Sequence, residues 1–184
     1  MDVRFKYNEP AEAKKIYFEQ IFAEKPGGGV LTSVGAYDVP PTTAVAELEG
    51  KLVPLTGYKL VAPVNTGDTT IKIAKGTPIA VGTVLGTGKK AVACTKVDKS
   101  NAEYDLVTVT LGVACEAGKV LYEAKAASAD SAVPVLTPQY VTGNWAYANE
   151  GDQAVRLING ANLRKETANI ASEVAALLPG INLV

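Results

Sequence analysis

Short runs in which apolar and polar residues alternate fill the middle of this 184-residue chain, and glycines separate the runs. In residues 69–74, Ile71 and Ile73 fall on one face and Lys72 on the other, which is typical of a strand with one buried side. Residues 106–111 repeat this alternation with mostly β-branched side chains. Glycines at positions 76, 82, 86, 88 and 112 favour tight turns or bulges between the runs. The pattern predicts a mainly β protein with a small β-barrel or β-sandwich body.

Near the N-terminus the pattern changes to one typical of a helix. Asn8 is a suitable N-cap, Pro10 suits the first turn, and acidic residues are placed favourably for the helix dipole. Apolar residues continue around much of the helical wheel after this start. We therefore expect a helix from Glu9 to about Ala23.

The C-terminal part has a second helical pattern. Ile170, Val174, Leu177 and Leu178 recur at i, i+4, i+7 and i+8, which predicts an amphipathic helix capped by Thr167 or Asn169. Pro179 and Gly180 should end it, and the apolar residues 181–184 should pack within the chain.

These patterns divide the chain into three zones: an N-terminal arm with a short helix (1–55), a β body (56–162), and a C-terminal helix with an apolar tail (163–184). Within the body we expect an exposed loop at 124–132, a last strand from Ala154 to Ile158, and Trp145 and Tyr147 as anchors where the chain returns to packed structure.

All three phenylalanines lie in the first zone. Large aromatic side chains outside a β body either cap that body or dock on another subunit. The glycines at 27–29 and the prolines at 40 and 41 favour an arm that reaches a neighbour. The candidate contact residues are Phe5, Tyr17, Phe18 and Phe22.

Charge and composition narrow the partners. The chain has 18 basic and 19 acidic residues, a formal net charge of −1, and no basic cluster, so we expect no nucleic-acid partner. No apolar run approaches the ~20 residues of a membrane-spanning helix, and residues 1–10 lack the apolar core of a signal peptide, so we expect no membrane partner.

Candidate chemistry is sparse. The chain has no histidine, which excludes Ser-His-Asp and Cys-His catalysis. Glu103 and Asp105 form the best carboxylate couple, and we interpret them as solvated turn charges. Cys94 and Cys115 have no metal-ligand spacing and are interpreted as small buried thiols, with a disulfide between them left open. The glycines at 27–29 do not continue into a phosphate-binding motif, and residues 98–103 lack the spacing of a calcium loop. We expect no catalytic residues, no cofactor and no metal site, and therefore no enzyme.

Several of these runs carry a family resemblance. The residues from Gly67 to Gly76, followed by residues 79–86 and 111–114, resemble the bacteriophage lambda-type head decoration family. Residues 155–162 are similar to the closing strand of that family, so the resemblance covers about residues 56–165. It implies a non-enzymatic β-barrel-like protein on the outer surface of a virion capsid, made in the host cytoplasm and standing as trimers at three-fold positions. The implied partners are the major capsid protein, part of which pairs with the N-terminal segment, and the protein itself as a homotrimer.

Three alternatives remain open. The longer aromatic N-terminal zone and the apolar C-terminus depart from the family pattern and leave room for a head fibre or spike base. A small β-barrel enzyme or a carbohydrate-binding module belongs to a different class. A sugar binder would expose aromatic residues along the β body, whereas here Trp145 is the only tryptophan and the tyrosines are dispersed along the sequence.

Overall fold

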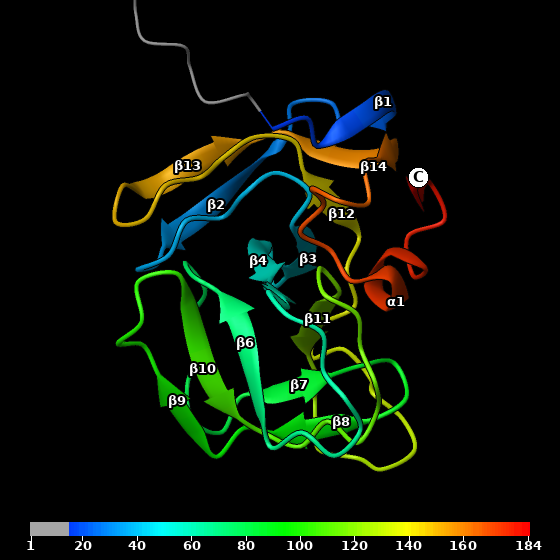
Figure 1. The fold of residues 1–184 in the computed structure, drawn as a ribbon. Helices are drawn as coiled ribbons and strands as arrows, with labels where there is room; N and C mark the ends of the chain where they lie inside the picture. The colour runs from blue at the N-terminus through cyan, green and yellow to red at the C-terminus, as the bar shows by residue number, and fades with distance from the viewer. Residues whose placement is uncertain (1–14) are drawn as a thin grey trace, which may run out of the picture.

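A computed structural model of the protein describes residues 15–184, and almost all of the regular structure in this part is β (Figure 1). The strands form three sheets, one of which is a half-barrel, and the largest sheet has eight strands. Its strands are β1 (Phe18–Glu24), β2 (Gly29–Val34), β3 (Ala44–Leu48), β4 (Lys51–Leu55), β12 (Tyr140–Thr142), β13 (Gly151–Val155), β14 (Leu157–Leu163) and β15 (Ile181–Leu183). They follow the order β1-β14-β12-β3-β4-β2-β13, and β15 pairs with β14.

Two smaller sheets lie below the large one in the view of Figure 1. One has the order β6-β10-β9 and contains β6 (Thr70–Ala74), β9 (Lys96–Asp98) and β10 (Tyr104–Thr108). The other has the order β5-β11-β7-β8 and contains β5 (Gly57–Lys59), β7 (Val84–Gly86), β8 (Ala91–Ala93) and β11 (Val120–Glu123). The predicted mainly β class is therefore confirmed.

The alternation along β6 and β10 positions the core between the smaller sheets. Ile71 and Ile73 are buried, and Val107 pairs directly with Ile71. Leu85 and Leu121 from the neighbouring sheet pack into the same cluster. The side-chain faces that we expected from the sequence are those observed.

The helix expected from Glu9 to Ala23 is wrong for its second half, because Phe18–Glu24 is strand β1. In the register with β14, one extra residue stands between Phe18 and Gln20 and another between Ile21 and Ala23. Such bulges shift the side-chain alternation, so Phe18 and Ile21 both pack against the core although they are three residues apart. Residues 9–14 of the expected helix lie outside the described residues.

The expected C-terminal helix is reduced to one turn, α1 (Ser172–Ala175). The preceding segment is tied to the body, because Asn169 donates its backbone N–H to Thr42 Oγ1 at 2.9 Å and its side-chain N–H to the Pro41 carbonyl at 2.9 Å. Of the expected apolar stripe, Leu177 is exposed. The apolar tail packs within the chain as expected, since β15 pairs with β14.

The large sheet combines strands from all three zones of the sequence. Residues 29–55, which belong to the N-terminal zone of the sequence, supply β2, β3 and β4. The expected strand from Ala154 to Ile158 is divided between β13 and β14, and Arg156 lies between them with its backbone N–H bonded to Asn144 Oδ1 at 2.7 Å.

Candidate functional site

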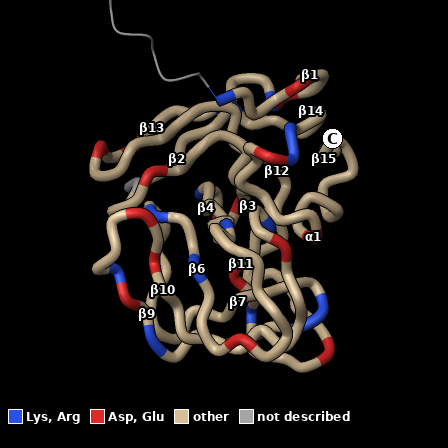
Figure 2. The backbone as a smooth tube through the Cα atoms, in the orientation of Figure 1, with Lys and Arg blue, Asp and Glu red and all other residues tan. Residues whose placement is uncertain are grey.

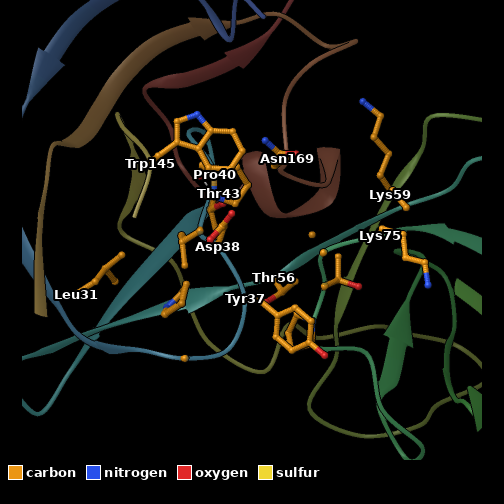
Figure 3. A pocket seen from close by; sticks show the side chains of 18 of the residues that line it. Leu31, Tyr37, Asp38, Pro40, Thr43, Thr56, Lys59, Lys75, Trp145 and Asn169 are labelled. Atoms are coloured by element: carbon orange, nitrogen blue, oxygen red, sulfur yellow. Dashed lines mark hydrogen bonds between the residues drawn. The ribbon is translucent and has the colours of Figure 1, made fainter. Parts of the chain in front are cut away.

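A pocket of about 770 Å³ lies at the junction between the large sheet and the smaller sheets (Figure 3). Five separated segments line it: residues 15–17, 31–43, 52–59, 74–78 and 166–169, together with Trp145. In Figure 3, Trp145 and Tyr37 stand on two sides of the pocket, with Pro40 and Thr43 between them in the view. This volume lies within the range of about 300–1,000 Å³ that is typical of small-molecule sites.

One wall of the pocket is a hydrogen-bonded turn at residues 40–43. Thr43 and Thr142 each donate a hydroxyl hydrogen bond to the Pro40 carbonyl at 2.8 Å. Thr142 Oγ1 also accepts the Thr43 backbone N–H at 3.1 Å. The donors for the Pro40 carbonyl are therefore one hydroxyl from within the turn and one from β12.

Thr42, in the middle of this turn, has a φ of +66°. A β-branched residue in the left-handed region is a true conformational outlier. Residues in such strained conformations persist where their surroundings fix them, and they cluster at binding and active sites. Here the fixing contacts include the bond from the Asn169 backbone N–H to Thr42 Oγ1.

Thr77 supplies the pocket with an unused polar group. Its side chain is only 9% exposed. Its Oγ1 is the one buried side-chain oxygen or nitrogen in residues 15–184 that lacks a hydrogen-bond partner. Most buried polar groups in native proteins are hydrogen-bonded, so an orphan in a pocket lining points to a missing partner.

Three aromatic rings form a continuous cluster at the pocket. Trp145 stacks on Tyr147 at 6.3 Å between ring centroids with an interplanar angle of 10°, and it meets Tyr17 edge-on at 6.4 Å and 81°. Tyr17 and Trp145 line the pocket, and burial raises the pKa of Tyr17 above its ordinary value.

The expectation that Trp145 and Tyr147 anchor packed structure is wrong. Trp145 is 38% exposed and Tyr147 is 50% exposed, whereas Ala146 between them is fully buried. Alternation along the chain turns both large rings outward, and Ala146 occupies the interior position in a bridge with Val39. The tyrosines are dispersed in the sequence, but two of them join the only tryptophan in space.

Two lysines of the pocket lining, Lys59 and Lys75, are engaged with other groups of the protein. Lys59 donates to the Glu166 carbonyl, and its pKa is lowered, first by burial and then by the nearby charge of Lys15. Lys75 Nζ lies 2.6 Å from Asp105 Oδ1 and 2.7 Å from the Lys99 carbonyl. Figure 2 shows that basic and acidic residues are interspersed over the molecule.

The interpretation of Asp105 as a solvated turn charge is wrong, since its side chain is only 2% exposed. It lies within β10, on the inward face that carries Val107, and Lys75 from the end of β6 neutralises it. Glu103 lies in the exposed turn before the strand. The two carboxylates therefore differ in environment and do not share one solvated turn.

The candidate contact residues occupy different positions. Phe18 is half-buried against the core of the large sheet, whereas Phe22 is 55% exposed and lies over Gly160 of β14. Tyr17 belongs to the aromatic cluster, and Phe5 lies outside the described residues.

Both cysteines are buried and free, which agrees with their interpretation as small buried thiols. Within the described part of the chain, no group of three or more His, Cys, Asp or Glu side chains is placed to hold a metal ion. None of the helical structure between residues 15 and 184 has the length and hydrophobicity of a membrane-spanning helix.

No protein-family model matches the chain, and no curated protein or solved structure is significantly similar to it. Tyr17 and Trp145 were singled out from the sequence, whereas Tyr37 and Thr77 were missed as pocket residues. The paired prolines at 40 and 41 were the one local signal of unusual backbone structure here.

Proposed function

We propose that the chain is a non-enzymatic structural virion protein that decorates and stabilises the outer surface of a tailed-phage capsid, as trimers at three-fold positions. The proposal starts from the resemblance of residues 56–165 to the lambda-type head decoration family. The observation that carries it further is the position of β1 at the edge of the large sheet.

Within the described residues, β1 pairs with β14 on one side only. An edge strand presents backbone N–H and C=O groups that can pair with a strand of another chain. Next to that edge, Phe22 and Ile16 expose apolar surface. Edge and apolar surface together suit a contact with a capsid subunit.

The charged side chains of β1 fit a strand whose outer edge contacts a capsid subunit. Glu19 pairs with Arg164 and Glu24 with Arg156, and both arginines flank β14. These ion pairs connect β1 to its own sheet. Many copies of a modest contact then stabilise an assembled shell, because each binds the assembled state preferentially.

The first test is quantitative mass spectrometry of purified virions, which gives the copy ratio of this protein to the major capsid protein. A ratio of order one supports decoration. A few dozen copies per virion would instead favour a head fibre or spike base. Absence of the protein from virions would refute both virion roles.

The contact itself is tested with Phe22→Asp and the control Val81→Asp, which also places a charge at an exposed apolar position. We expect Phe22→Asp to lower capsid occupancy at least about tenfold while Val81→Asp leaves it unchanged. Equal occupancy of both variants would refute the role of β1. Sedimentation of the free full-length chain separately tests the trimer.

A further inference from the structure

The pocket beside Trp145 has the features of a ligand site, although the proposed decoration of a capsid requires no ligand there. It has a volume of about 770 Å³, its lining includes Thr77 with an unpartnered buried hydroxyl, and the turn that forms one wall carries the strained Thr42 behind the surface. Strain and unsatisfied polar groups both cost folding free energy. Their coincidence in one pocket indicates a function there.

The mouth of the pocket has a fixed aromatic surface. The loop that carries Trp145 and Tyr147 is held by Gln153, whose side chain accepts the Tyr147 backbone N–H at 2.8 Å and donates to the Tyr147 carbonyl at 2.6 Å. Asp38 Oδ1 accepts the Ala148 backbone N–H at 2.8 Å. The exposed rings are therefore preorganised, which lowers the entropy cost of binding a flat partner.

The polar lining is rich in uncharged groups. Thr43, Thr56, Thr77 and Asn169 contribute hydroxyl and amide groups, which both donate and accept hydrogen bonds. A ligand that matches them carries hydroxyl groups of its own.

The charges of the pocket balance. Its lining contains Lys15, Lys59 and Lys75 against Asp38 and Glu166, and the ion pair between Lys75 and Asp105 removes the remaining positive charge. A site without net charge offers an anionic ligand no electrostatic gain.

We propose that this pocket binds a neutral saccharide. The apolar C–H face of one sugar ring stacks on Trp145 near Tyr17. The Thr77 side chain, whose Oγ1 is closed to solvent in the structure, rotates to exchange a hydrogen bond with a sugar hydroxyl. Sugars combine an apolar ring face with a rim of hydroxyl groups, and the pocket pairs an aromatic surface with uncharged polar groups. The saccharide site does not include the paired edge of β1, so either proposal can fail without the other.

Trp145 is the only tryptophan, so its fluorescence reports on this pocket directly. The full chain is titrated with D-glucose, D-galactose, D-mannose, N-acetylglucosamine, lactose and maltose to about 20 mM, which saturates a site with a Kd of about 1 mM. Saturation-transfer NMR provides a second readout that does not depend on tryptophan. We expect a saturable change with at least one of these sugars.

Thr77→Val removes only the unpartnered hydroxyl and keeps the side-chain shape, so it should fold normally and weaken sugar binding at least about fivefold. Thr69→Val, at an exposed position outside the lining, is the matched control and should bind like the wild type. Trp145→Phe, followed by NMR, should weaken binding about tenfold. The proposal is overturned if none of the sugars binds, or if sugar binding survives both Thr77→Val and Trp145→Phe. It is also overturned if adenosine or a proline-rich peptide binds in the pocket and no sugar does.

Discussion

The packing of the C-terminal segment on the body depends on one glycine, Gly57, and this gives a quantitative prediction. A Cβ atom built on Gly57 would lie 2.2 Å from the Asn169 carbonyl oxygen and 2.7 Å from Val120 Cγ1. Contacts under 3.0 Å essentially never occur for a real Cβ atom, so something must move. Val120 can turn aside, but the carbonyl belongs to the backbone and moves only with its segment.

We therefore expect Gly57→Ala to destabilise the protein by about 3 kcal/mol, the upper end of the usual cost of overpacking. For a chain of this size, that loss lowers the Tm by about 6–12 °C. Thermal unfolding followed by circular dichroism and a urea midpoint at constant m value measure the change. Gly67→Ala is the matched control, because a Cβ there meets nothing within 4 Å, and it should stay within about 0.5 kcal/mol of the wild type.

The tie between Asn169 and the turn at residues 41–42 makes the mechanism testable. Asn169→Ala removes the side-chain bond to the Pro41 carbonyl, so the segment can move away from a new methyl group more easily. The double variant Gly57→Ala, Asn169→Ala should then lose less stability than the sum of the single variants. A Tm of Gly57→Ala equal to that of Gly67→Ala, or strict additivity in the double variant, would refute this reasoning.

Three further predictions concern the core. Burial raises the pKa of Tyr58 well above its ordinary value of 10.0, and the nearby charges of Glu123 and Cys94 add to the shift. Above about pH 10 the unfolded chain therefore loses a proton that the folded protein keeps. Stability should fall there by about 1.4 kcal/mol per pH unit, and Tyr58→Phe should lessen the slope of urea midpoints against pH. Leu157→Ala, at a fully buried position, should cost about 3 kcal/mol by urea unfolding, whereas the exposed Leu177→Ala should cost under about 0.5; equal costs would contradict the observed packing. Since both cysteines are buried and burial raises the pKa of Cys115, iodoacetamide should label the native protein slowly. It should label two thiols after unfolding without reductant, whereas no labelled thiol would indicate a disulfide between Cys94 and Cys115.

The parts of the fold that could be predicted depend on local alternation. Ile71 and Ile73 stand in a regular strand, where side chains alternate without interruption, so their buried face followed from the sequence. Phe18 and Ile21 stand in a strand with bulges, where an extra residue changes the alternation to a spacing of three. Pairing with a strand 140 residues away decides the bulge, and no local pattern contains that information.

Trp145 shows a different error. The residues Trp145, Ala146 and Tyr147 follow the same alternation as a strand, which places both large rings on one face and alanine on the other. Size favoured burial of the rings, but the fully buried position beside Val39 is taken by Ala146. The pocket could not be predicted at all, because five distant segments build it and the orphan state of Thr77 Oγ1 exists only in the folded protein.

Tyr17 connects the proposed capsid contact with the proposed saccharide site. Its ring meets Trp145 edge-on in the pocket, and its backbone carbonyl accepts the Arg164 N–H just before β1 begins at Phe18. A capsid strand that pairs with β1 therefore acts on a segment whose first residues line the pocket. A sugar on Trp145 would lie beside Tyr17 of the same segment, so if one ligand changes the affinity for the other, linkage requires the same factor in the reverse direction. If capsid binding shifts β1, the fluorescence of Trp145 reports it, so one tryptophan can measure both events and the coupling between them.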